Sequence, residues 1–280
     1  MWQSYDALKY QSHGVQGMKL RSVIKRFQDA FCPRYSRHGE RYERIYHVHI
    51  RKCAGTSLNK CFIKGLGGSG GDYGRLAKKL NHHLVLPRGP VVGWNVDLIN
   101  KGAYFYAFSH QPYHQLHLQP NTFSFTFLRD PISRIISHYT MLKDMLESGT
   151  KHPAMMTEGS WALGDFDSFL SKISRPHLEN QLYMFDENFD VARGLERLKS
   201  LSYVGDISQI KRDFIPEVAR EFSLDLDYQP LRSSKNRFNP TAEQLENLKT
   251  LIATEIQFYD AAKEFFRFDT VSVCRITRSL

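Results

Sequence analysis

The chain has 280 residues, of which 41% are hydrophobic, and it carries 38 Lys and Arg against 29 Asp and Glu for a formal net charge of +9. No stretch approaches the ~18 consecutive apolar residues that a membrane-spanning helix needs, and no secretory signal follows Met1. The four cysteines have no metal-ligand spacing and do not indicate an oxidising compartment. The positive charge suits a polyanionic partner: a nucleic acid, an acidic polysaccharide, a membrane surface or a multiply phosphorylated cofactor.

The chain is expected to divide into an N-terminal leader at residues 1–41, a main domain at residues 42–268 and a tail at residues 269–280. Within the leader, residues 18–31 place apolar side chains at helical spacing among lysines and arginines. Such a basic amphipathic helix can lie on a membrane surface. A helix packed on the domain, or a flexible leader, explains the same pattern and is the preferred interpretation.

A predicted anion site follows the first strand of the domain. The apolar run at residues 45–50 predicts a short buried strand, and Thr56 and Ser57 begin a predicted helix. Between them lies a tight turn that contains Lys52 and Gly55. Backbone N–H groups and the helix dipole favour anions at a helix start, and Lys52 and the two hydroxyls add a charge and donors. The order differs from the ATP-binding loop Gly-x4-Gly-Lys-Ser/Thr, because the lysine precedes the glycine.

Two further predicted strands end in polar residues. One strand, at residues 103–108, leads to His110, and the other, at residues 122–128, leads to Arg129. In open α/β sheets, ligands bind at the carboxyl ends of the strands. We therefore expect His110 and Arg129 to lie near Lys52, at one edge of a parallel sheet.

The helix after the third strand has strong start signals. Asp130 is a favourable N-cap and Pro131 a favourable first helical residue. Apolar side chains then mark one face as far as Glu147. Ser133 and Ser137 are four residues apart, so they share a face of this helix.

The rest of the domain is assigned more coarsely. Helices are predicted at residues 165–173, 177–185, 191–199 and 208–222 and from Thr241 onward, and a strand at residues 201–206. Residues 65–74 are interpreted as a mobile surface loop, residues 147–164 as a polar, irregular segment that is a candidate substrate lid, and residues 232–237 as a basic loop.

Two motifs resemble those of a known family. Residues 51–57 resemble the 5′-phosphosulfate loop of sulfotransferases that use 3′-phosphoadenosine 5′-phosphosulfate (PAPS), although Arg51 stands where proline is usual. Residues 127–139, Phe-Leu-Arg-Asp-Pro-Ile-Ser-Arg-Ile-Ile-Ser-His-Tyr, resemble the family's 3′-phosphate motif along their whole length. The resemblance spans about residues 42–268 and points to the 2-O-type and bacterial carbohydrate branch. It implies a three-layer α/β fold of the P-loop nucleoside-triphosphate-hydrolase type, with a central parallel β-sheet flanked by helices.

The resemblance also implies roles for individual residues. The family's catalytic base is a histidine that ends a strand between the two motifs, which corresponds to His110; Ser109 occupies the place of the usual glycine. The 3′-phosphate would be held by Arg129 and Ser137. The implied cofactor-binding set further contains Arg51, Lys52, Cys53, Ala54, Gly55, Thr56 and Ser57 at the 5′ end and Lys235 in the basic loop.

Three other features concern Arg134, residues 179–181 and Cys53. Arg134, which matches the family's second arginine, is expected to be structural. Residues 179–181, Glu-Asn-Gln, resemble a family segment with different spacing, and no role is assigned to them. Cys53 could be a low-pKa thiolate beside Lys52, but a small packing residue is the preferred interpretation.

The resemblance implies transfer of a sulfuryl group from PAPS to an acceptor hydroxyl, that of a carbohydrate in this branch. Lys52 would stabilise charge on the 5′-phosphate, neutral His110 would take the hydroxyl proton, and no metal would be required. The expected enzyme is cytoplasmic, at most membrane-peripheral, and does not bind nucleic acid. A nucleotide kinase or ATPase and a non-catalytic polyanion-binding module stay open as alternatives.

Overall fold

A six-stranded sheet forms the centre of the molecule. The computed structural model describes residues 42–79, 82–230 and 238–268. The strands lie in the order β2-β3-β4-β1-β5-β6. Their bounds are β1 Arg44–Val48, β2 His83–Leu86, β3 Gly89–Gly93, β4 Tyr106–Ser109, β5 Thr122–Leu128 and β6 Tyr203–Asp206. Only the β2–β3 pair of this sheet is antiparallel, so the expected α/β fold with a mostly parallel central sheet is confirmed.

Aromatic side chains fill the core on one face of the sheet, where α3 (Gly55–Gly65) and α12 (Ile215–Glu221) pack. The Phe62 ring of α3 stacks on Tyr106 of β4 at 4.4 Å between centroids. Burial of such large rings contributes much of the stability of a core. Because α3 is fixed to the sheet in this way, the turn that precedes it is held at the end of β1.

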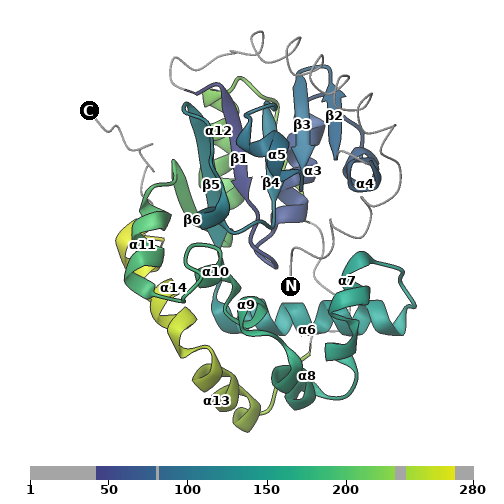
Figure 1. The fold of residues 1–280 in the computed structure, drawn as a ribbon, viewed down its shortest axis with the longest axis vertical. Coiled ribbons are helices and arrows are strands. Elements are labelled where there is room, and N and C mark those ends of the chain that lie inside the picture. The colour runs from purple at the N-terminus through teal and green to yellow at the C-terminus, as the bar shows by residue number, and fades with distance from the viewer. Residues whose placement is uncertain (1–41, 80–81, 231–237, 269–280) are drawn as a thin grey trace, which may run out of the picture. The chain divides into compact units, whose positions relative to one another are not determined.

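A second core lies beyond the carboxyl ends of the parallel strands. It contains apolar side chains of α6 (Pro131–Glu147), α8 (Phe166–Lys172) and α13 (Ala242–Leu251), among them Tyr139, Phe169 and Leu248. Figure 1 shows these helices below the sheet, on the side where β1 and β5 end. The carboxyl edge of the sheet therefore faces a helical layer.

The remaining elements are helices and helical turns. The helices are α4 Asp72–Lys78, α5 Val96–Asn100, α7 Pro153–Thr157, α9 Arg175–Leu178, α10 Asn180–Tyr183, α11 Val191–Lys199 and α14 Ala253–Phe266. The 3-10 turns are η1 Tyr113–Gln115, η2 Gly159–Ala162 and η3 Ile207–Gln209, and η4 (Ile210–Phe214) is a π-helical turn.

The predicted starts of two helices are confirmed, and at each start the side chain of the N-cap residue accepts a backbone N–H. The Asp130 carboxylate accepts the Ser133 N–H at 2.8 Å, and α6 spans the predicted range. The Thr241 hydroxyl accepts the Gln244 N–H at 3.2 Å at the start of α13. The predicted C-terminal helix is nevertheless two helices, since α13 ends at Leu251 and α14 begins at Ala253.

Two segments interpreted as loops are more ordered than predicted. Within residues 65–74, Asp72 begins α4, and its buried carboxylate accepts the Ser69 N–H and hydroxyl. Within residues 147–164 lie α7 and η2, and Glu158 between them is only 1% exposed. Each segment thus contains one buried carboxylate, Asp72 or Glu158, and a single sequence does not distinguish a buried carboxylate from an exposed one.

Several predictions fall on residues that the structure does not describe. These are the leader with its basic segment at residues 18–31, the tail, and the basic loop that contains Lys235. Within the described residues, no helix is long and apolar enough to cross a bilayer.

A buried ion pair joins α6 to α14 and gives the first testable prediction. Arg134 Nε of α6 lies 2.9 Å from Glu255 Oε1 of α14, and both side chains are fully buried. Removal of one partner from a buried pair typically costs about 3–5 kcal/mol. We expect Glu255→Gln to lower the free energy of unfolding by about this amount in urea denaturation. The control Glu246→Gln removes the exposed pair with Lys249 and is expected to cost at most about 1 kcal/mol; equal losses for both variants would contradict the structural role of Glu255.

Candidate functional site

The turn between β1 and α3 has an unusual backbone. Lys52 and Ala54 both have positive φ angles, of 66° and 62°. Left-handed residues of this kind occur in the concave turns that bind anions. Ala54 is the N-cap of α3, yet it supplies no side-chain acceptor to the first helical turn. The amides of a first turn need acceptors from outside the helix, and the helix dipole favours a negative one.

Lys52 adds a charge to this turn. Burial, and next the charge of Arg129, lower the pKa of Lys52 to about 8. Within residues 42–79, 82–230 and 238–268, the Lys52 ammonium makes no ion pair with a carboxylate. A partly buried cation next to a second cation is unfavourable in the free protein, so the site favours an anionic ligand.

Arg129 brings the second predicted turn to the first. It follows β5, which pairs in parallel with β1. Its guanidinium Nη1 donates to the Lys52 carbonyl oxygen at 3.2 Å. Lys52 and Arg129 therefore lie at one site, as the sequence predicted.

Gln181 of α10 holds the backbone of Arg129 in place. Its side-chain oxygen accepts the Arg129 N–H at 2.8 Å, and its side-chain nitrogen donates to the Arg129 carbonyl at 2.9 Å. The Cys53 thiol lies 3.6 Å from the same Gln181 oxygen. The buried Glu255 carboxylate accepts both the Gln181 N–H, at 2.9 Å, and its side-chain amide, at 3.3 Å. One carboxamide thus links both turns to the buried ion pair of the helical layer.

Arg51, which replaces the family's usual proline, is tied to the helical layer. Its N–H donates to Asn180 Oδ1 at 3.2 Å, and its guanidinium lies 2.7 Å from Glu158 Oε1. The other Glu158 oxygen lies 2.8 Å from Nε2 of His138. Burial raises the pKa of Glu158, but the His138 hydrogen bond and the Arg51 charge outweigh it and hold that pKa at about 2. A proline at this position would restrict φ through its ring. Here the bond to Asn180 and the ion pair with Glu158 hold Arg51 in place instead.

His110 follows β4, beside the end of β1. Its Nδ1 lies 2.8 Å from the His49 carbonyl oxygen. Because a carbonyl only accepts, Nδ1 carries the proton and Nε2 of the neutral ring is an acceptor. Nε2 makes no hydrogen bond within the described part of the chain. Burial, and next the charge of Arg51, lower the pKa of His110 to about 3, which keeps the ring neutral near pH 7.

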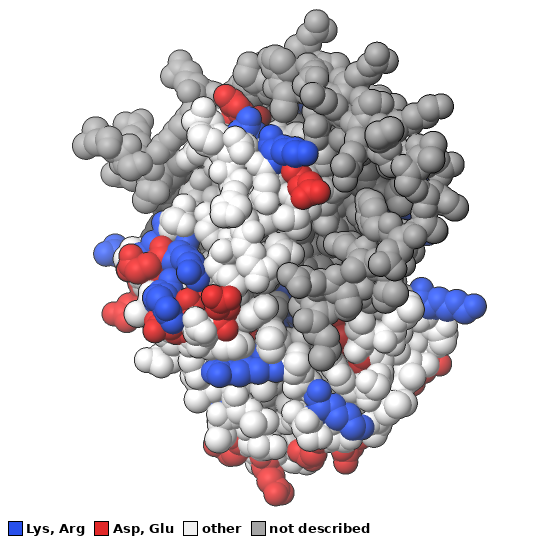
Figure 2. Space-filling view, in the orientation of Figure 1, with Lys and Arg blue, Asp and Glu red and all other residues white. Residues whose placement is uncertain are grey.

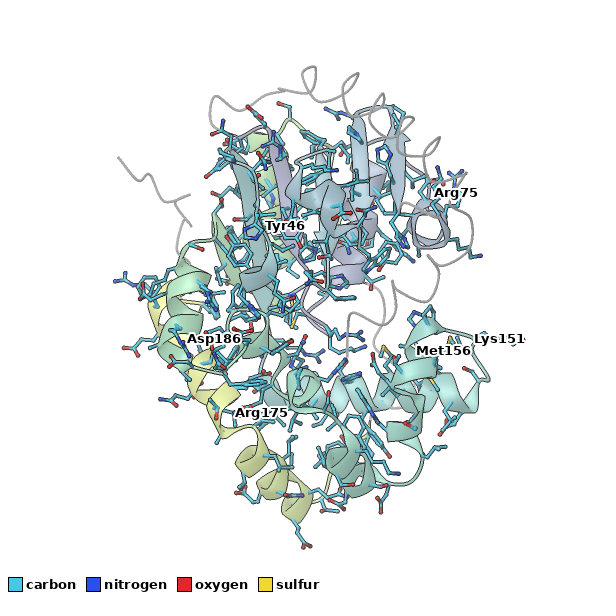
Figure 3. The ribbon with its side chains drawn as sticks, in the orientation of Figure 1. Tyr46, Arg75, Lys151, Met156, Arg175 and Asp186 are labelled. Atoms are coloured by element: carbon cyan, nitrogen blue, oxygen red, sulfur yellow. The ribbon has the colours of Figure 1, made fainter. Side chains whose placement is uncertain are left out.

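Ser109, which stands in place of the family's glycine, has a structural partner. Its hydroxyl lies 2.8 Å from the hydroxyl of Tyr46, a side chain that Figure 3 shows within the sheet. The Ser109 oxygen also accepts the Gln111 N–H at 3.1 Å. These bonds shape the backbone just before and after His110.

Of the other predicted site residues, Thr56 and Ser57 lie on α3, Ser137 lies on α6, and Cys53 lies in the turn before α3. Thr56 is half-buried at the start of α3, and Ser57 is buried beside Tyr228. Ser137 is half-buried on α6. Cys53 is buried, and burial raises the pKa of its thiol to about 12, which confirms the packing interpretation over a reactive thiolate. Among the described residues, no group of three His, Cys, Asp or Glu side chains is arranged to hold a metal ion.

Charged residues of both signs lie together over α11. Figure 2 shows Lys and Arg intermixed with Asp and Glu over α11. Arg193 lies 3.5 Å from Asp186, Arg197 lies 3.0 Å from the same carboxylate, and Lys199 pairs with Glu196. The described residues over α11 therefore form no continuous basic surface for a polyanion.

The sequence analysis assigned no role to four residues that position the site: Glu158, Asn180, Gln181 and Glu255. Asn180 and Gln181 lie in the segment 179–181, which resembles a family segment but differs from it in spacing, so the sequence assigns them no role. The available signal was the polar character of each residue, which several of its neighbours share. It does not name the partner, since Gln181 meets a residue 52 positions earlier and Glu255 one 121 positions earlier.

One comparison with known proteins identifies a family. The model of the Sulfotransferase family matches residues 39–214, which include both turns and His110. No curated protein matches the chain.

Gly55 gives a prediction that tests the geometry of the first turn. A Cβ atom on Gly55 would lie 1.8 Å from Cδ2 and 2.0 Å from Nε2 of His49. We expect Gly55→Ala to lower the free energy of unfolding by about 1–3 kcal/mol, the usual range for overpacking, as measured by denaturant titration. Gly74 is a matched control, because it is also helical and a Cβ there meets nothing within 4 Å; Gly74→Ala is expected to be neutral or stabilising by up to about 1 kcal/mol. An equally well tolerated Gly55→Ala would show that the His49 ring is not packed against the start of α3.

Proposed function

The chain belongs to the sulfotransferase family, and from this premise we propose that it transfers a sulfuryl group from PAPS to a hydroxyl group of a carbohydrate. Transfer of a sulfuryl group is the general chemistry of the family. The observation that best supports our choice of donor is the contact between the Lys52 turn and Arg129, at 3.2 Å from carbonyl oxygen to guanidinium. Two cationic turns in contact suit one ligand with two separate phosphate groups.

The described residues fit such a nucleotide at both ends. Lys52 and the first-turn amides of α3 would hold the 5′ end, because they combine a partly buried cation with outward donors. Arg129 and Ser137 would hold the 3′-phosphate. The N-terminus of α6 already has an acceptor in Asp130, so this phosphate would rely on side chains more than on the helix start. Lys235 lies outside the described residues, and its contact with the 3′ end stays a prediction.

When bound, PAPS supplies a sulfuryl group joined to a phosphate that can leave. The residues of the chain hold negative charge at the 5′ end and accept a proton. Lys52 and the α3 amides stand ready to stabilise charge that develops on the phosphate, as fixed donors do in sites of this type. The first-turn amides need no rearrangement for this, since Ala54 does not cap them with a side chain.

His110 is the proposed base. Its Nδ1–H is directed to the His49 carbonyl, so Nε2 is free to take the proton of an acceptor hydroxyl. A negatively charged ligand beside the ring would raise the pKa of His110 from about 3 toward the range where a general base works best. Glu158 is a weaker candidate, because Arg51 and His138 already occupy its carboxylate.

The acceptor is proposed on less direct grounds. The carbohydrate class follows from the resemblance of the two motifs and from the net charge of +9, which suits an anionic glycan. The cytoplasmic location, peripheral membrane contact through residues 18–31 and the absence of nucleic-acid binding stay predictions.

The proposed function is tested by transfer of labelled sulfate from PAPS across a panel of glycans, phenols and steroid alcohols. The expected result is a labelled glycan, together with a raised melting temperature in adenosine 3′,5′-bisphosphate but not in ATP with Mg²⁺. Stabilisation by ATP with Mg²⁺ alone would favour the kinase or ATPase alternative. Label on a phenol or a steroid alcohol alone would retain the transferase and reject the carbohydrate acceptor.

Lys52 makes ligand affinity depend on pH. A bound phosphate favours the charged ammonium, whose pKa is about 8 in the free protein. Below pH 8 the ammonium is already charged, so affinity for adenosine 3′,5′-bisphosphate is expected to be highest there and to fall as the pH rises further. In calorimetric titrations, Lys52→Arg should abolish this fall up to about pH 10, because a guanidinium stays charged. Lys52→Ala should weaken binding roughly 10- to 100-fold at pH 7. Affinity of the wild type that stays flat from pH 7 to 10 would contradict the assignment.

His110 is tested by turnover. We expect His110→Ala to lower kcat about 10²- to 10⁴-fold, the usual contribution of a positioned base, with little change in affinity for adenosine 3′,5′-bisphosphate. His117→Ala is the control, because His117 is an exposed histidine of the same segment and should retain wild-type turnover. Wild-type turnover in His110→Ala would remove the base from this residue.

A further inference from the structure

A buried histidine that the proposed reaction does not use lies beside His110. His49 follows β1 and is 4% exposed. Val48 pairs with Ser109 in the register of β1 and β4, so the next residues, His49 and His110, lie side by side. Their ring centroids are 4.2 Å apart. The two rings meet at the carboxyl edge of the sheet, directly before the anion turn.

The hydrogen bonds of Asn59 determine which nitrogen of His49 carries the proton. Asn59 Oδ1 accepts from the Tyr106 hydroxyl at 2.7 Å and from His47 Nδ1 at 2.8 Å. The Asn59 amide nitrogen then faces His49 Nδ1 at 3.3 Å. Because that nitrogen can only donate, His49 Nδ1 accepts, and the proton of the neutral ring lies on Nε2. His49 and His110 therefore have opposite tautomers.

The protonated nitrogen lies over the start of α3. A Cβ atom on Gly55 would come within 2.0 Å of His49 Nε2. Since Cβ atoms of a helix point toward its N-terminus, this edge of the ring lies at the end of α3 where the anion is expected. Nε2 makes no hydrogen bond to any residue in the described part of the chain. Among the described residues, this N–H of a buried side chain therefore has no acceptor, and it lies beside the first-turn amides.

The ring has a reason to stay neutral. Burial, and next the repulsion that His110 would exert if it were also protonated, lower the pKa of His49 well below its usual value. A neutral ring offers one N–H, and the Asn59 bond fixes which one. The two rings can therefore make different hydrogen bonds to a ligand, because Nε2 of His110 accepts and Nε2 of His49 donates.

We propose that His49 is a further ligand-binding residue of this site and donates its Nε2–H to an oxygen at the 5′ end of the donor nucleotide. This inference rests on the proposed function and deepens it. It also assigns a purpose to Gly55, whose missing side chain leaves room for the ring at the helix start. Asn59 and Tyr106 are then positioning residues, since they act through the tautomer of His49.

Two substitutions at His49 separate binding from packing. His49→Asn keeps a side-chain oxygen where Nδ1 meets Asn59 but removes the donor at the position of Nε2. His49→Gln can place an amide N–H near that position. We expect His49→Asn to bind adenosine 3′,5′-bisphosphate at least about 10-fold more weakly than the wild type, as for a lost bond to a charged group, and His49→Gln to keep most of the affinity. Affinity for adenosine 3′-monophosphate, which lacks the 5′ anion, should not change. Equal losses for both nucleotides, or no loss for either, would overturn the proposal.

His47→Asn is the matched control, because His47 is buried on the same strand and bonds the same Asn59. It should lower the melting temperature without changing the ratio of the two affinities. Imidazole ¹⁵N spectra of the full-length wild type give a second readout that does not depend on how the variants fold. They should show His49 protonated at Nε2, with that signal shifted by adenosine 3′,5′-bisphosphate. A proton on Nδ1, or an Nε2 signal that no ligand shifts, would overturn the proposal.

Failure of the proposed function is distinguishable from failure of this inference. If the wild type does not bind adenosine 3′,5′-bisphosphate, the donor assignment fails, and inorganic sulfate becomes the probe of His49. A sulfate-dependent shift of the Nε2 signal would then support His49 as an anion ligand, and its absence would reject it.

Discussion

The two cationic turns are held in one geometry by the carboxamide of Gln181. It pairs with both the N–H and the carbonyl of Arg129, and its oxygen is also reached by the Cys53 thiol. Glu255 fixes Gln181 in turn, through one bond to its backbone and one to its side chain. A single amide group pairs with both the backbone N–H and the backbone carbonyl of Arg129. The turn after β5 therefore cannot rotate away from the turn after β1 without leaving these backbone groups unpaired. Everything proposed for the site assumes that these turns stay in contact.

The charges in this geometry are unequally satisfied. Arg51 has a buried carboxylate partner in Glu158, whereas Lys52 lies against Arg129 with no carboxylate partner among the described residues. The free protein thus gives up stability at Lys52, and a bound anion would restore it, which is the usual linkage between ligand and stability. The two neutral imidazoles add no charge to this balance. His110 and His49 offer one acceptor and one donor, and the bonds of the surrounding backbone and of Asn59 set which is which.

Local chemistry accounts for what could be predicted from the sequence. The aromatic and β-branched residues of β5 and the Asp-Pro start of α6 act within a few residues, so the bounds of both elements were predicted correctly. Lys52, His110 and Arg129 were placed together because each follows a predicted strand of one parallel sheet. The roles of Gln181 and Glu158 could not be predicted, since their partners lie 52 and 107 residues away and nothing in the local pattern identifies those partners. Glu158 lies in the segment predicted to be a polar, irregular candidate lid, and its burial could not be predicted because buried and solvated carboxylates look alike in a single sequence.

The central claim is that one nucleotide spans both turns, and a crystal structure with adenosine 3′,5′-bisphosphate tests it most directly. The account predicts the 5′-phosphate within hydrogen-bond distance, roughly 2.7–3.2 Å, of Lys52 and the first amides of α3, and the 3′-phosphate at a similar distance from Arg129. A ligand that contacts only one of the two turns, or that binds away from the carboxyl ends of β1 and β5, would contradict it.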